Sequence, residues 1–134
     1  MNEISVFSSL NVLVVEDEAF SLRFVLRILQ KIGVSNVLDA ANGAEALERL
    51  ANADTRIDLV FSDIEMPEMD GYELVRRIRD GAVPEYKDVP VLMLTGQNID
   101  DAEETARIHK IDGYIVKPPK PDQLEVHMRR TLGL

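Results

Sequence analysis

The chain has 134 residues with no cysteine, and its 24 acidic and 15 basic side chains give a formal net charge of −9 at pH 7. A single domain of this size buries about two-thirds of its unfolded surface, and without cysteine it has no disulfide, thiolate metal site or thiol nucleophile. The negative charge argues against direct binding to nucleic acid or to an anionic membrane, while the lack of cysteine, of a leader and of a long apolar run favours a soluble cytoplasmic protein.

The apolar pattern predicts five buried strands that alternate with five helices. Residues 1–10 show no periodicity and are expected to form a flexible lead or an early helical turn. Strands are predicted at 12–15, 36–39, 59–61, 91–94 and 114–116, and helices over 18–32, from 42 through 50, from 70 onward, over 100–110 and from 121 through 132. Gly33 is placed to end the first helix, and Asn42 and Asp70 are placed to cap the second and third.

Two segments depart from this regular pattern. The helix predicted over 100–110 has a thin apolar stripe of Ala102, Ala106 and Ile108, so we expect it to be less firmly docked than the others. The connection between residues 80 and 90 is long for an alternating α/β unit, which makes it a candidate partner-facing segment.

Alternating strands and helices with short connections predict a doubly wound α/β domain, in which helices cover both faces of a parallel sheet. Ligands of such sheets gather at the carboxyl ends of the strands. Four of the five predicted strands end there in an ionic or hydroxyl side chain: Glu16 with Asp17, Asp63, Thr95 and Lys117.

Three carboxylates at one sheet edge repel each other by about 4 kcal/mol per pair at close range. An oxygen-only acidic cluster suits Mg²⁺, which takes one or two carboxylates and keeps several waters. A metal, a lysine and a hydroxyl around one carboxylate are suited to phosphoryl transfer, and that carboxylate can be the acceptor. We therefore predict that Asp63 becomes an aspartyl phosphate.

These residues resemble the receiver domains of bacterial two-component response regulators, and the resemblance covers residues 11–132. It rests on Glu16-Asp17 after the first strand, Asp63 followed by Met66-Pro67 and Asp70-Gly71, Thr95 after the fourth strand, and Lys117-Pro118 after the fifth. The resemblance implies a flavodoxin-like (βα)5 sandwich with the strand order 2-1-3-4-5, preceded by the lead of residues 1–10.

The resemblance also implies the roles of the edge residues. Asp63 would be the phosphoacceptor, and Mg²⁺ would be held by Asp17 and Asp63, by Glu16 through water, and by the main-chain carbonyl of Glu65. Lys117 would pair with the phosphoryl group.

Two residues would carry the switch that the resemblance implies. Thr95 would move toward the phosphoryl oxygen, and Tyr114 would rotate inward into the space vacated, which repacks the face made by the fourth helix, fifth strand and fifth helix. An ordinary half-buried tyrosine whose hydroxyl meets water is the alternative for Tyr114. A cis bond is implied between Lys117 and Pro118, and His109 and His127 are interpreted as surface residues.

The sequence departs from the family pattern at two positions. Gly96 stands where a small residue such as alanine is common, which keeps access to the phosphoryl group open. Pro119 replaces a hydrophobic residue that often follows Lys-Pro, so a packing side chain is expected to be missing there. Glu65 and Gln97 occupy positions that, in the family, flank the route of the attacking water and tune the lifetime of the phosphorylated state.

The leading hypothesis is a stand-alone receiver, not an enzyme beyond its own phosphorylation and dephosphorylation. A histidine kinase or histidine phosphotransfer protein would donate the phosphoryl group, an effector protein would be bound downstream, and the chain would be a monomer or a phosphorylation-dependent dimer. Only 17 residues follow Lys117, so no output domain is expected.

Two alternatives stay open. The chain could be a receiver domain from a larger regulator or hybrid histidine kinase. It could also be a phosphohydrolase of the haloacid dehalogenase type, although Glu65 stands where that family has a second aspartate and Met66 where threonine or valine is usual.

Overall fold

The computed structural model of the protein describes residues 6–134. Strands and helices alternate along it, and one short 3-10 helix interrupts the alternation. The elements are β1 (Asn11–Val15), α1 (Ala19–Lys31), β2 (Asn36–Ala40), α2 (Gly43–Asn52), β3 (Leu59–Asp63), α3 (Gly71–Arg79), η1 (Pro84–Tyr86), β4 (Val91–Thr95), α4 (Ala102–His109), β5 (Gly113–Val116) and α5 (Pro121–Leu132). In this described part of the chain, no helix is both long and apolar enough to cross a membrane.

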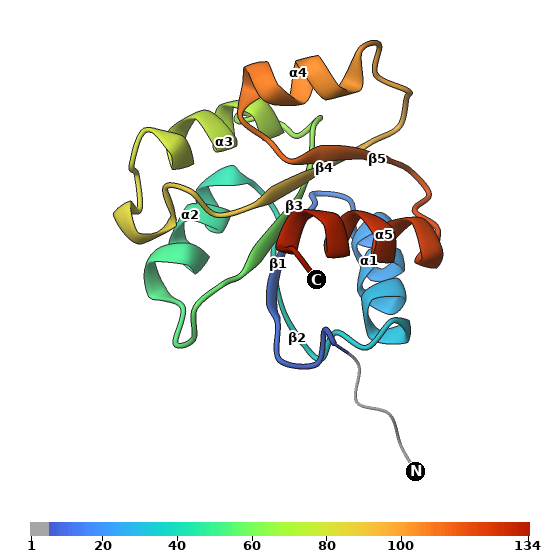
Figure 1. The fold of residues 1–134 in the computed structure, drawn as a ribbon. Helices are drawn as coiled ribbons and strands as arrows, with labels where there is room; N and C mark the ends of the chain where they lie inside the picture. The colour runs from blue at the N-terminus through green and yellow to red at the C-terminus, as the bar shows by residue number, and fades with distance from the viewer. Residues whose placement is uncertain (1–5) are drawn as a thin grey trace.

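The five strands form one parallel sheet in the order β2-β1-β3-β4-β5, which confirms the predicted doubly wound fold. Helices α1 and α5 cover one face, and α2, α3 and α4 cover the other (Figure 1). Successive strand residues point to opposite faces. Val12 and Val14 therefore belong to the core under α1 and α5, while Leu13 and Val15 belong to the core under α2 and α3.

The helix boundaries follow from local capping. Glu18 precedes α1 and accepts hydrogen bonds from the backbone of Phe20 and Ser21, while Asn42 caps α2 and Asp70 caps α3 in the same way. These caps satisfy backbone N–H groups that have no partner inside the helix. The predicted caps at Asn42 and Asp70 are thus confirmed, whereas Glu18 lies before the first helix and not within it.

The connection between α3 and β4 is held against the core. Val83, Tyr86 and Val89 are all buried, and the hydroxyl of Tyr86 accepts a hydrogen bond of 3.0 Å from the backbone N–H of Ile57. Apolar anchors explain why this long segment has a defined path. Its prediction as a partner-facing segment stays untested.

Helix α4 is the least buried helix of the fold. The residues that flank it, Asp101 and Lys110, are both in the left-handed backbone conformation, and no side chain caps its first turn. Ala106 is its one buried residue, whereas Ala102 and Ile108 are exposed. The expected weak docking is therefore borne out, but the predicted stripe of three residues is wrong because only Ala106 contacts the core.

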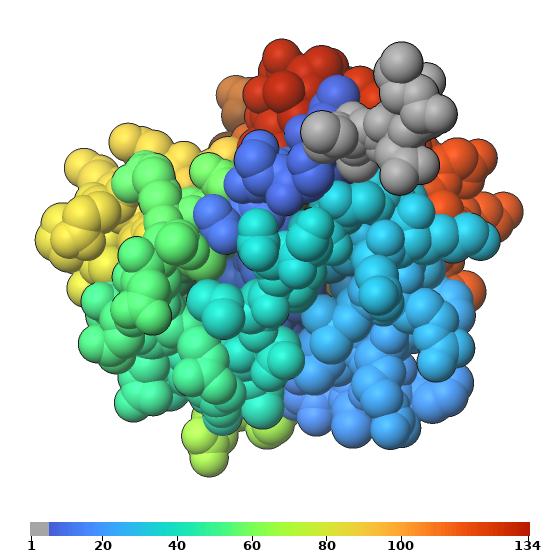
Figure 2. Space-filling model, turned by 90° about the horizontal axis from the view of Figure 1, so that it is seen from below, coloured from blue at the N-terminus to red at the C-terminus, as the bar shows by residue number. Residues whose placement is uncertain are grey.

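The predicted lead, residues 1–10, lies partly outside the described residues. In the described part, Phe7 is 1% exposed and packs into the core beside α1 and α5. Figure 2 shows this N-terminal segment (dark blue) beside the C-terminal helix (red). The guanidinium of Arg129 lies 5.4 Å from the centre of the Phe7 ring, within the range of a cation–π contact.

Candidate functional site

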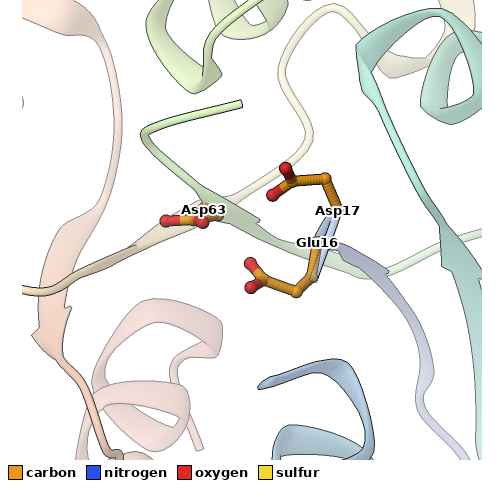
Figure 3. A group of neighbouring side chains, drawn as sticks. All are labelled: Glu16, Asp17 and Asp63. Carbon is orange, nitrogen blue, oxygen red and sulfur yellow. The ribbon is translucent and has the colours of Figure 1, made fainter. Parts of the chain in front are cut away.

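Three carboxylates from two neighbouring strands meet at the carboxyl edge of the sheet. Glu16 and Asp17 directly follow β1, and Asp63 ends β3, which pairs with β1 (Figure 3). The backbone N–H of Glu16 donates to the carbonyl of Ala40 at 3.0 Å, so the β1–β2 ladder continues into the site. One oxygen from each carboxylate lies within 4.8 Å of the others. The structure thus brings the three predicted acids together.

The three acids differ in burial. Asp17 is exposed, Asp63 is half-buried and Glu16 is only 2% exposed. Burial, a hydrogen bond with Asp63 and the negative charge of Asp63 together raise the pKa of the Glu16 carboxyl from 4.5 to about 7, although Lys117 acts in the opposite direction. A cation that enters the site would favour the ionised form of this carboxyl, which would release its proton to solvent.

Lys117 neutralises part of this negative charge. Its Nζ lies 3.2 Å from Glu16 Oε1 and 3.2 Å from Asp63 Oδ2. Burial lowers the pKa of Lys117, but the charges of Asp63 and Glu16 outweigh burial and leave that pKa raised. The backbone explains this placement, since the N–H of Lys117 donates to the carbonyl of Thr95 at 2.7 Å. The bond between Lys117 and Pro118 is cis, as predicted.

Thr95 shares a cavity of about 420 Å³ with Asp63 and Lys117. Its hydroxyl donates to the carbonyl of Gln97 at 3.0 Å and accepts from the N–H of Gln97 at 3.2 Å. The hydroxyl is thus held by its own loop. A methyl group at Gly96 would meet open space, in keeping with the expected free access at this position.

The start of α3 is packed directly against the end of β3. The N–H of Gly71 donates to the carbonyl of Ile64 at 2.7 Å, and a Cβ at Gly71 would overlap the carbonyl oxygen of Asp63. Only glycine allows this close backbone approach. The following residue, Tyr72, consequently lies at the site and lines the cavity of Asp63.

Tyr114 does not line the cavity of Asp63, but it reaches that cavity through Tyr72. The two hydroxyl oxygens are 2.7 Å apart. Sequence reasoning missed Tyr72, although its place directly after the Asp70-Gly71 helix start was a usable signal. The hydroxyl of Tyr114 therefore has Tyr72 as a protein partner, and the choice between a switch residue and an ordinary half-buried tyrosine stays a prediction.

The structure tests the predictions for Glu65 and Pro119 only in part. Glu65 is exposed and lines the same cavity, and its main-chain carbonyl as a metal ligand stays a prediction. Pro119 was expected to leave a packing position empty, but its ring is itself buried, so the proline fills that position.

The donor set fits a hard divalent cation. All its side-chain donors are carboxylate oxygens from Glu16, Asp17 and Asp63, and Asp17 is open to solvent on one side. Mg²⁺ prefers such ligands and retains waters at open positions. Lys117 reduces the repulsion among the acids without filling the exposed side of Asp17.

A parallel doubly wound sheet whose carboxyl edge carries three acids and a lysine is the arrangement predicted from the sequence for a receiver domain. A family model described as the response regulator receiver domain matches residues 12–129. The chain belongs to this family, whose CheY-like members act in two-component signalling and are not conventional enzymes. This assignment favours the receiver prediction over a phosphohydrolase.

Individual relatives agree with this assignment. Chemotaxis protein CheY1 of Helicobacter pylori is 35% identical over 125 residues, which are 92% of this chain and 98% of that protein. Transcriptional regulatory protein YvrH of Bacillus subtilis is 34% identical over 90% of this chain and 50% of its own length.

Solved structures give the same result. CheY4 of Vibrio cholerae is 33% identical with a TM-score of 0.78, over 92% of this chain and 98% of that one. CheY of Borrelia burgdorferi, in a complex with CheX, BeF3 and Mg²⁺, is 27% identical with a TM-score of 0.78, over 90% and 87%.

The raised pKa of Glu16 predicts a pH-dependent stability. Between pH 4.5 and about 7 the folded chain keeps a proton on Glu16 that the unfolded chain has lost, so stability falls as pH rises through this window. Relative to Glu16→Gln, the metal-free parent should lose on the order of 1–3 kcal/mol of unfolding free energy between pH 5 and pH 8.

Urea denaturation in EDTA at both pH values measures this difference. Subtracting the unfolding free energy of one protein from that of the other cancels the contributions of carboxyls that both proteins contain. Glu18 and Glu73, whose pKa values are lowered by hydrogen bonds, are among them. A difference that stays constant between pH 5 and pH 8 would show that Glu16 titrates normally in the folded protein.

Proposed function

We propose that this protein accepts a phosphoryl group on Asp63 from a phosphohistidine of a partner protein and then changes its binding to an effector protein. The observation that carries the proposal is the position of Asp63, with Lys117 Nζ at 3.2 Å and two further carboxylates beside it at the sheet edge. No other group of three acidic or histidine side chains within the described residues is arranged to hold a metal.

In the transfer step, a carboxylate oxygen of Asp63 forms a bond to phosphorus. The bond from phosphorus to the imidazole nitrogen of the donor breaks, and the imidazole leaves with that electron pair. Lys117 can follow the phosphoryl oxygens, since its ammonium already contacts Asp63. It then stabilises the charge on those oxygens in the transition state.

Asp17 and Asp63 would hold Mg²⁺, with Glu16 acting through water and Glu65 through its main-chain carbonyl. The metal, when bound, supplies a second positive charge next to the transferred group. Mg²⁺ in the structure of the Borrelia burgdorferi relative supports this choice of ion. The raised pKa of Glu16 lets its protonation state adjust to the arriving cation.

The exposed aromatic residues of α1 support docking of a phosphodonor protein. Phe20 and Phe24 lie one helical turn apart and are 68% and 40% exposed. The helix that carries them begins two residues after Asp17. A partner bound to these rings would sit beside the acidic site.

The output face would be formed by α4, β5 and α5. Each element exposes one large aliphatic side chain, namely Ile108, Val116 and Val126. Phosphorylation would draw the Thr95 hydroxyl away from Gln97 and allow this face to repack around Tyr114. Apolar side chains exposed on three neighbouring elements are suited to a protein partner.

The test is the intact mass after incubation with acetyl phosphate, with Mg²⁺ or with EDTA. We expect one phosphate adduct in Mg²⁺ and a yield at least about 10-fold lower in EDTA, because the metal offsets charge in the transition state. No adduct in either condition would refute phosphoacceptor function. Equal yields in both would refute the role of the metal.

A further inference from the structure

Tyr72 stands between the phosphorylation cavity and a second hollow. It lines the 420 Å³ cavity with Asp63 and Lys117, and it also lines a groove of about 650 Å³ between α3 and α4. Its backbone follows Gly71, which is pressed against the carbonyl of Asp63. The Tyr72 backbone is therefore fixed relative to the phosphoacceptor.

The side chain of Tyr72 contacts two elements of the proposed output face. Its hydroxyl forms the 2.7 Å hydrogen bond with the hydroxyl of Tyr114 on β5. Its ring packs on the ring of His109 at the end of α4, with centroids 4.1 Å apart and the planes tilted by 32°. One residue of α3 thus touches both β5 and α4.

The hydrogen bond between the hydroxyls of Tyr72 and Tyr114 lies in a partly buried region, so its loss should affect the orientation of both side chains. Both tyrosines are partly buried and pack against the core cluster beneath α2, α3 and α4. If one tyrosine hydroxyl is removed, the other loses its protein partner. The remaining tyrosine gains a full replacement from water by turning its side chain outward. Burial, followed by the bond to Tyr72, also raises the pKa of Tyr114.

We propose that Tyr72 is a positioning residue of the switch, whose hydroxyl holds Tyr114 inward against α3 and whose ring ties that arrangement to α4. The proposal rests on the proposed function, because it assigns to Tyr72 the link between the Asp63 cavity and the output face. The net strength of one hydrogen bond corresponds to a change of about 2- to 10-fold in the ratio of inward to outward Tyr114.

Tyr72→Phe tests this directly, because it removes the hydroxyl and keeps the ring that contacts His109. The chain has three tyrosines, so tyrosine labelled with ¹³C in the ring gives NMR signals from Tyr72, Tyr86 and Tyr114 alone. Tyr86→Phe is the matched control, since it also removes one hydroxyl bond, the one to Ile57, away from the switch.

In Tyr72→Phe without phosphodonor, we expect the Tyr114 signals to move toward solvent-exposed positions while those of Tyr86 stay unchanged. In Tyr86→Phe the Tyr114 signals should not move. Unchanged Tyr114 signals in Tyr72→Phe would overturn the proposal. If the Tyr86 signals also moved in Tyr72→Phe, that variant would not be correctly folded. The reciprocal variant Tyr114→Phe would then replace it: shifted Tyr72 signals would support the proposal, and unchanged Tyr72 signals would overturn it.

The two proposals fail in different ways. The NMR comparison needs no phosphorylation, so it judges the link between Tyr72 and Tyr114 even if acetyl phosphate leaves no adduct. Conversely, the adduct experiment is made on the parent protein, so a parent that forms no adduct refutes the proposed function and leaves the hydrogen bond between Tyr72 and Tyr114 to be judged by NMR.

Discussion

Asparagine in place of Asp63 is expected to abolish the phosphate adduct formed with acetyl phosphate and Mg²⁺. The amide oxygen is a poor nucleophile and carries no charge for a metal ion, so both the acceptor and a metal ligand are lost. We expect the adduct to fall below about 1% of the parent yield, as measured by intact mass.

The Asp63→Asn protein should remain folded. The amide has nearly the same volume as the carboxylate, and Lys117 keeps its contact of 3.2 Å with Glu16. Losing Asp63 removes its hydrogen bond and charge from the surroundings of Glu16, so the pKa of Glu16 should fall toward its ordinary value. The pH dependence of stability described above should therefore shrink in this variant.

Asp39→Asn is the matched control for the loss of one negative charge. Asp39 is exposed on β2 and lies outside the acidic cluster, so this variant should form the adduct as the parent does. An adduct on Asp63→Asn at the parent level would place the acceptor on another residue.

Alanine in place of Phe7 should lower the free energy of unfolding by about 3–5 kcal/mol. The ring is almost completely buried beside α1 and α5, and its removal leaves a cavity in that core and takes the aromatic contact away from Arg129. Chemical denaturation with urea, followed by circular dichroism, measures the change.

The neighbouring Val6 provides a control in the same segment. It is 51% exposed, so Val6→Ala should change the unfolding free energy by less than about 0.5 kcal/mol. A loss below about 1 kcal/mol in Phe7→Ala would mean that the N-terminal segment leaves the core in solution.

Much of the fold could be read from the sequence because buried parallel strands have a strong signal. The run Val12 to Val15 is apolar at every position, as is Val91 to Leu94, and both are strands buried on both faces. The edge strand β2 is largely exposed, yet its short apolar stretch and the following cap at Asn42 still placed it.

The main residues of the site were also predictable, because parallel strands bring their carboxyl ends to one edge. Glu16, Asp17 and Asp63 were placed together by strand order, and Lys117 joins them in contacts of 3.2 Å. Their roles in phosphoryl transfer remain proposals that the acetyl phosphate experiment tests.

What the sequence could not give were side-chain directions and long-range partners. The hydroxyl of Thr95 turns to Gln97, and that of Tyr114 turns to Tyr72, which lies 42 residues earlier. Such pairs depend on rotamers and on how α3 sits on the sheet. Phe7 was missed for a related reason, since one aromatic residue in a short segment has no periodicity to reveal its burial.

The weak attachment of α4 sets how stability is distributed across the molecule. The acidic edge is built on β1 and β3, which lie in the interior of the sheet, whereas α4 has Ala106 as its one buried residue and a left-handed residue at each end. Helices held by so few buried groups open locally at a small fraction of the global unfolding free energy. A change at the acidic edge could therefore alter the position of α4 while the strands of the sheet keep theirs.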